Sequence, residues 1–228
     1  VYSTGDYVGG IVGYHRSSTL STNLTFGSEN GGDVVSGGSY VGGVAGYFRG
    51  SSSSSARITA ANYGAVLGTN YVGGIYGNRA NTDWYSTYTN AGNVTATGDY
   101  VGGITGYSGT GLQFNNMTNS GAVTGHNYVG GIVGEGTFLG TYTYSTDTTA
   151  YDVVNTGAVT GSEAVGGIAG TATRIYSRPG SDMRNEGTVT GEKNVGGLIG
   201  TESSSSFFYS MYSQSFGGVL TNEGAVQG

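Results

Sequence analysis

The chain has 228 residues, of which 47 are glycine and 19 are tyrosine, with one proline, no cysteine and 10% charged residues. This composition excludes a disulfide scaffold, and it differs from a typical disordered segment, which combines low hydrophobicity with high net charge and few aromatic residues. The net charge of -6 provides no basic stripe for nucleic acid, and no run of about 18 apolar residues predicts a membrane span.

Two short motifs recur along the chain. The first, Val-Gly-Gly-(Ile/Val/Leu)-x-Gly, begins at Val8, Val41, Val72, Val101, Val129, Val165 and Val195. The second, Asn-x-Gly-x-Val, begins at Asn30, Asn62, Asn90, Asn119, Asn155, Asn185 and Asn222. The valine of the second motif precedes the valine of the first by six or seven residues, whereas 13 to 22 residues separate the first motif from the next asparagine. Two fixed segments and one variable segment therefore make up each repeat.

This pattern predicts an all-β, parallel β-solenoid that forms a single domain over residues 1–228. We expect it to be three-sided and right-handed, with about seven coils of 28–37 residues. In chain order, the expected coils lie near residues 1–29, 30–61, 62–89, 90–118, 119–154, 155–184 and 185–221, and a further coil starts at 222–228. Because no atypical capping repeat is visible at either end, we expect the chain to be a segment of a longer array.

Equivalent residues of successive coils are expected to stack in register. The valine of the second motif is β-branched and favours a strand, as expected for Val34, Val66, Val94, Val123, Val159, Val189 and Val226. The glycine pair permits a bend that lets Val and Ile of Val-Gly-Gly-Ile both point inward. The repeated asparagine fits a turn and a side-chain hydrogen-bond ladder.

A tyrosine precedes the first motif in five repeats, and Ala164 and Asn194 replace it in the last two. With strands about 4.8 Å apart, these rings would form an aromatic ladder. A stabilising role is favoured over a ligand platform for Tyr7, Tyr40, Tyr71, Tyr100 and Tyr128.

The segments 8–13 and 195–200, each paired with an Asn-x-Gly-x-Val-Thr-Gly segment such as 155–161, resemble the GLUG-motif repeats of bacterial surface proteins. The resemblance covers essentially the whole chain. It implies a secreted, exposed bacterial protein in which the repeats form a stalk or an adhesive region. Some members also carry a zinc peptidase with a His-Glu-x-x-His motif, which this sequence lacks, so that activity does not transfer.

Catalytic and metal-binding patterns are weak, and neither an enzyme nor a cofactor nor a metal site is expected. His15 and His126 are the only histidines and lie on non-equivalent segments, which argues against a triad and against zinc. A carbohydrate-active enzyme would need clustered carboxylates, but solvated loop charges are favoured for Asp83, Asp147, Asp152, Asp182, Glu202, Arg79, Arg174, Arg178 and Arg184. No calcium-ligating aspartate recurs after the first motif, which is followed by Tyr14, Tyr47, Asn78, Tyr107, Glu135, Thr171 and Thr201.

Threonine pairs of the form Thr-x-Thr begin at Thr95, Thr141 and Thr171. They do not fall in one register around the coil. The sequence therefore argues against a regular threonine face of the kind that binds ice.

The variable segments are rich in aromatic residues amid Ser, Thr, Gly and Asn. This composition is typical of binding loops, in which rigid rings supply contact area and small polar residues supply adaptable hydrogen bonds. Packing of these rings against the solenoid is favoured over a binding face. If a ligand site exists, its candidates are Trp84, Tyr142, Tyr144, Tyr151, Phe207, Phe208, Tyr209 and Tyr212.

The sequence thus favours a structural or adhesive repeat module of a secreted bacterial surface protein or extracellular fibre. Its expected location is extracellular. Its expected partners are a host or environmental glycan or protein, or neighbouring copies that meet at the solenoid ends. Two alternatives remain: a filament subunit that stacks end to end, and a carbohydrate-active β-helix lyase or hydrolase.

Overall fold

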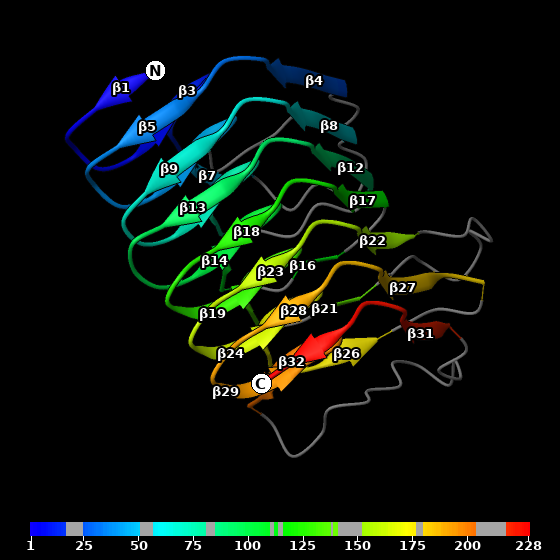
Figure 1. Ribbon diagram of the computed structural model, residues 1–228. Coiled ribbons are helices and arrows are strands. Elements are labelled where there is room, and N and C mark those ends of the chain that lie inside the picture. The colour runs from blue at the N-terminus through cyan, green and yellow to red at the C-terminus, as the bar shows by residue number, and fades with distance from the viewer. Residues whose placement is uncertain are drawn as a thin grey trace.

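The computed structural model describes residues 1–16, 25–50, 57–80, 85–109, 112–113, 116–137, 139–140, 152–176, 180–203 and 218–228. Every regular element in these residues is a β-strand, and the strands stack in parallel sheets along one axis (Figure 1). The predicted fold class, an all-β parallel solenoid, is confirmed.

Four long sheets run the length of the solenoid. Sheet A contains β1 (Tyr2–Ser3), β5 (Val34–Ser36), β9 (Val66–Gly68), β13 (Val94–Ala96), β18 (Val123–Thr124), β23 (Val159–Thr160), β28 (Val189–Thr190) and β32 (Val226–Gln227). Sheet B contains β2 (Val8–Gly9), β6 (Val41–Gly42), β10 (Val72–Gly73), β14 (Val101–Gly102), β19 (Asn127–Gly130), β24 (Glu163–Gly166) and β29 (Lys193–Gly196).

The other two long sheets follow sheets A and B within each coil. Sheet C contains β3 (Val12–Arg16), β7 (Ala45–Arg49), β11 (Tyr76–Arg79), β15 (Thr105–Ser108), β20 (Val133–Gly136), β25 (Ala169–Ala172) and β30 (Ile199–Glu202). Sheet D contains β4 (Thr25–Asn30), β8 (Arg57–Asn62), β12 (Tyr85–Asn90), β17 (Asn116–Asn119), β22 (Val153–Asn155), β27 (Asp182–Asn185) and β31 (Val219–Asn222). A small sheet E contains β16 (Leu112–Gln113), β21 (Leu139–Gly140) and β26 (Ile175–Tyr176).

Each coil contributes one strand to each of sheets A to D, so the expectation of three sides is corrected to four strand segments. The physical reason is the glycine pair, at which the first motif bends and divides between sheet B and sheet C. The expected count of about seven coils includes the two end coils, which have a paired neighbour on one side only. Among the described strands, five turns are enclosed on both sides.

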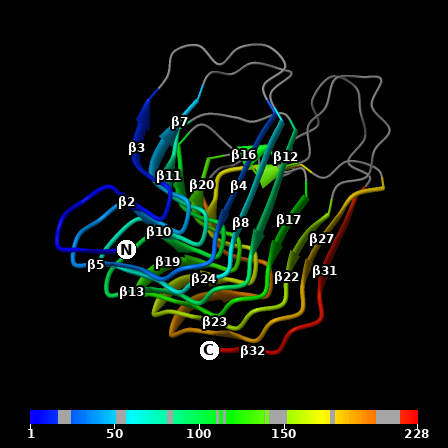
Figure 2. The same cartoon turned by 90° about the horizontal axis from the view of Figure 1, so that it is seen from above.

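The motifs set the register between coils. Val72 pairs with Val41 on one side and with Val101 on the other, and Asn90 pairs with Asn62 and Asn119 in the same way. Viewed along the axis, the coils lie nearly over one another (Figure 2). Insertions between the motifs therefore leave the equivalent residues aligned.

The interior holds two separate apolar cores. The core between sheets A and B is built almost wholly of valine, such as Val66 and Val72. The core between sheets C and D holds larger side chains, such as Ile75 and Met117. The Val and Ile of Val-Gly-Gly-Ile are thus both buried as expected, but in different cores.

Glycine makes the wall between the two cores thin enough for this arrangement. A Cβ atom on Gly73 would lie 2.1 Å from the carbonyl oxygen of Tyr76 and 2.7 Å from the Cα atom of Thr105. The backbones of sheets B and C are therefore in direct contact, with no room for a side chain between them. The first glycine of the motif is required by this close approach rather than by a positive φ.

Candidate functional site

Asparagine side chains form a continuous column at the turn from sheet D to sheet A. From Asn30 to Asn185, each Nδ2 donates to the Oδ1 of the asparagine in the next coil, at 2.7 Å from Asn30 to Asn62 and at 2.8 Å along the rest of the column. Each Nδ2 also donates to the carbonyl oxygen of the glycine two residues later, at 2.7 or 2.8 Å. The interior members are fully buried. The column contains Asn30, Asn62, Asn90, Asn119, Asn155, Asn185 and Asn222.

The second glycine of each first motif lies against this column. A Cβ atom on Gly103 would lie 2.1 Å from the carbonyl oxygen of Gly131 and 2.3 Å from the Cγ atom of Asn119. The two sequence motifs are therefore in contact inside every coil. The column and the glycines are structural, because their polar groups are used internally and are closed off from solvent.

Tyrosine side chains form a second stack at the corner between sheets A and B, which we name the inner rank. Consecutive ring centroids are 4.7 to 4.9 Å apart, and the planes differ by 10° or less. These residues have φ between 54° and 63°, in the left-handed region that non-glycine residues rarely adopt. The inner rank contains Tyr7, Tyr40, Tyr71, Tyr100 and Tyr128.

Beside the inner rank, sheet C presents an outer rank, which we define as Tyr14, Tyr47, Asn78, Tyr107 and Glu135. These residues are in register from coil to coil. Tyr14 and Tyr47 stack at 4.7 Å, and Tyr107 meets the rings of Tyr71 and Tyr100 edge-on, at 5.9 and 6.0 Å. Together, the inner and outer ranks form the tyrosine face, the candidate site of this protein.

The electrostatics of the tyrosine face favour neutral phenols. Burial, followed by the nearby Glu135 carboxylate, raises the pKa of Tyr100 to about 12. Burial is also the main cause that raises the pKa of Tyr40 and of Tyr71. The pKa of Glu135 is itself raised by burial. The centre of the inner rank, at Tyr40, Tyr71 and Tyr100, therefore keeps its phenols neutral to higher pH than a free tyrosine.

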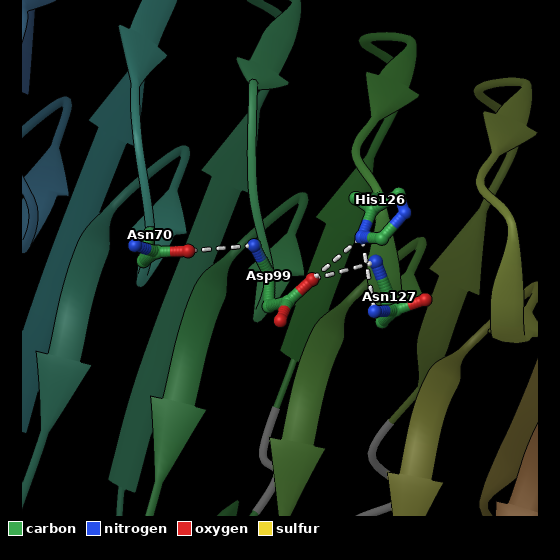
Figure 3. A network of polar contacts seen from close by, with 4 residues as sticks. All are labelled: Asn70, Asp99, His126 and Asn127. Atoms are coloured by element: carbon green, nitrogen blue, oxygen red, sulfur yellow. Dashed lines mark hydrogen bonds and ion pairs between the residues drawn. The ribbon is translucent and has the colours of Figure 1, made fainter.

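Next to the inner rank, short polar side chains close the corner from one coil to the next (Figure 3). The Oδ1 of Asn70 accepts a hydrogen bond from the backbone N–H of Asp99 at 2.8 Å. The Oδ1 of Asp99 accepts one from the N–H of Asn127 at 3.1 Å and lies 3.2 Å from Nδ1 of His126. Among the described residues, no serine hydroxyl bonds to the His126 ring. In this network, a side-chain oxygen of one coil accepts a hydrogen bond from a backbone N–H of the next coil, so its role is structural.

The charged residues weighed for catalysis are only partly brought together. Asp152 and Asp182 lie in neighbouring coils, where the N–H of Asp182 donates to Oδ1 of Asp152 at 3.3 Å, and both side chains are exposed. Arg184 instead pairs with Glu186 at 3.0 Å. Arg79 is buried away from these groups, and its guanidinium donates to the Tyr88 hydroxyl at 3.0 Å. Exposed Glu202 pairs in register with Ala172 of the neighbouring coil, two residues before exposed Arg174.

Several predicted site residues fall outside the described residues. These are the catalytic candidates Asp83, Asp147 and Arg178, and all the loop candidates for a ligand, Trp84, Tyr142, Tyr144, Tyr151, Phe207, Phe208, Tyr209 and Tyr212.

Sequence reasoning missed two surface patterns. The sequence signal of the outer rank is the residue that follows each Val-Gly-Gly-x-x-Gly motif, a position that the calcium argument alone leaves unexplained. A row of four threonines in register also runs along sheet A, and its signal was the Thr that follows the second-motif valine. The row contains Thr95, Thr124, Thr160 and Thr190.

Across the described part of the chain, no helix is long and apolar enough to cross a membrane. In the same residues, no three His, Asp or Glu side chains gather as a metal site would require. Comparisons with protein-family models, with curated proteins and with solved structures found no significant match.

Proposed function

We propose that the chain is a stiff scaffold module, structural or adhesive, of a secreted bacterial surface protein or extracellular fibre. The observation that carries this proposal is that all the variable segments are attached at the same place in the coil, between sheet C and sheet D. Each joins the end of a sheet C strand to the start of a sheet D strand. The shortest lies between Arg79 and Tyr85, and the two longest, of equal length, lie between Gly136 and Val153 and between Glu202 and Val219. The ends of variable segments of different length are therefore held at regular intervals along one side of the solenoid.

The interior supports the scaffold half of the proposal. Parallel hydrogen bonds and the buried asparagine column link every described coil to the next, so bending would strain bonds in all four sheets at once. The resemblance to GLUG-motif repeats supports an exposed, extracellular location. The aromatic and small polar composition of the loops supports contact with a glycan or protein partner.

Replacement of the loops tests this function. In one variant, short Gly-Ser linkers replace segments 141–150 and 204–217, and in a matched control Thr124 and Thr160 on sheet A are replaced by serine. Purified proteins on beads are tested for adhesion to bacterial and animal cell surfaces and to a glycan array. We expect both variants to keep the parent's far-ultraviolet circular dichroism, and only the loop variant to lose adhesion.

Two outcomes contradict the proposal. Equal adhesion of the parent and the loop variant would show that the loops do not carry binding. Cleavage of a glycan by the parent protein would instead favour a carbohydrate-active enzyme, and replacement of Asp152 or Asp182 by asparagine would then be the next test.

A further inference from the structure

The outer rank is interrupted at one coil. Asn78 pairs in register with Tyr47 on one side and with Tyr107 on the other. An amide thus stands where a third ring would continue the stack of Tyr14 and Tyr47. All three residues of the interruption are half-buried, so they lie at the surface.

The rings of the two tyrosines that flank Asn78 both stand nearly perpendicular to rings of the inner rank. The Tyr47 ring makes an angle of 82° with Tyr7, and the Tyr107 ring makes angles of 88° with Tyr71 and 87° with Tyr100. Tyr47 stacks on Tyr14, so its other face is turned toward the coil of Asn78, and Tyr107 stands nearly perpendicular to the inner rank as Tyr47 does.

The space between these rings has the width of one ring. Tyr47 and Tyr107 are two coils apart, which corresponds to about 9.5 Å. That distance is twice the 4.7 Å spacing at which Tyr14 and Tyr47 stack. One flat ring placed at the level of Asn78 would therefore lie one stacking distance from Tyr47 and one from Tyr107, as a tyrosine in that position would.

The polar groups around this space determine which kind of ligand ring would fit there. Among the described residues, the Asn78 amide makes no side-chain hydrogen bond, so its donors and acceptor are available at the base of the space. The coils on either side carry the hydroxyl-bearing residues Tyr47 and Tyr107, and Glu135 follows one coil beyond Tyr107. A ligand with apolar faces and a polar rim would satisfy both sets of groups.

We propose that Tyr47, Asn78 and Tyr107 form a slot for one pyranose ring of a glycan. A pyranose has C–H groups on both faces and hydroxyls around its rim. The aromatic side chain of a protein partner would fill the slot but leave the Asn78 amide unpaired, which costs free energy. A nucleobase would bring phosphates toward a chain of net charge -6. The inference deepens the proposed adhesive function and rests on it.

Saturation-transfer NMR with methyl pyranosides of glucose, galactose, mannose and N-acetylglucosamine tests the slot. The side-chain amide resonances of Asn78 are followed in the same titrations. We expect at least one pyranoside to receive saturation and to shift these resonances, with weak, millimolar affinity. The substitution Asn78→Tyr should complete the outer rank, leave the thermal unfolding midpoint equal or higher, and abolish both signals.

Matched variants separate loss of the slot from loss of the fold. Thr201→Tyr adds a ring to the same position of sheet C three coils beyond Tyr107, where the side chain is half-buried, so it should leave pyranoside binding unchanged. Tyr47→Ala removes one wall and should weaken binding by about tenfold, from the loss of one ring contact.

The slot is overturned if no pyranoside gives saturation transfer, or if Asn78→Tyr binds as the parent does. Binding of N-acetyltyrosine amide in place of the sugars would overturn the choice of ligand. The loop variant of the adhesion test keeps the slot intact. If the loop variant still binds pyranosides and also adheres as the parent does, the loop-based function is refuted. The slot proposal stands in that case.

Discussion

The asparagine column and the inner rank are both stacks of like side chains, but only the first continues through every coil. The column runs from Asn30 to Asn222, whereas the tyrosines end at Tyr128 and give way to Ala164 and Asn194. A buried asparagine bonds to two neighbouring coils and to its own backbone. A tyrosine at the corner is half exposed and loses only ring contacts when a neighbour is missing. The buried side-chain hydrogen bonds of the asparagine column therefore allow fewer residue types at their position than ring stacking at the surface does.

The corner also shows that backbone shape and side-chain identity are separable. Ala164 and Asn194 keep φ values of 56° and 54°, the same as the tyrosines. The path of the coil thus imposes the left-handed conformation, and the rings are added to it.

The largest expected effect concerns the contact between glycine and the asparagine column. Gly103→Ala would bring a methyl group within 2.1 Å of a backbone oxygen, and we expect the chain to fail to fold or to lose most of its cooperative thermal unfolding. Gly31→Ala is the control, because nothing lies within 4 Å of its added Cβ atom. Equal unfolding midpoints for the two variants would contradict the close packing.

Removal of one member of the column should be the next most costly change. Asn119→Ala leaves three groups unpaired, one of the two N–H groups of the Asn90 Nδ2, the carbonyl oxygen of Gly121 and the Oδ1 of Asn155. At about 1–3 kcal/mol for each buried group, we expect the free energy of unfolding to fall by several kcal/mol in a denaturant titration. The neighbouring exposed Ser120→Ala should change it by less than about 0.5 kcal/mol.

Glycine substitutions at the corner should change the free energy of unfolding in opposite directions within the inner rank and in the coils beyond it. A non-glycine residue in the left-handed region costs about 1–2 kcal/mol. Ala164→Gly should therefore raise the free energy of unfolding, by less than that because a buried methyl group is lost. Tyr100→Gly should lower it, because two stacked neighbours and an edge contact disappear. Stabilisation by Tyr100→Gly would show that the rings contribute nothing.

The smallest expected effect is a pH dependence on the alkaline side. Unfolded tyrosine releases its proton near pH 10, whereas the pKa of Tyr100 in the fold is about 12. The folded state therefore holds more protons in this window, and stability should fall as pH rises from about 10 to about 12. Glu135→Gln should lower the pKa of Tyr100 without restoring it to 10, because burial remains. The pKa of Tyr100 in the parent and in Glu135→Gln is measured by the absorbance of phenolate as pH rises. The variant Tyr100→Phe identifies the transition that belongs to Tyr100.

The repeat spacing was sufficient to predict the parallel stack, the alignment of the asparagines and the tyrosine ladder. It was not sufficient to predict four strand segments or two cores, since these depend on the backbone of Gly73 approaching that of Tyr76 in space. The same limit applied to the candidate site. The residues after the first motif were visible as a column, but the meaning of Asn78 emerged only when the rings of Tyr47 and Tyr107 were placed on either side of it.

Hydrogen exchange of the asparagine side-chain amides, measured by NMR, tests the stacked architecture most directly. The Nδ2 protons of Asn90 and Asn119 are buried and bonded along the axis, so they should exchange only through global unfolding, as slowly as the backbone amides of the central strands. Exchange at the rate of exposed asparagine side chains would contradict the account.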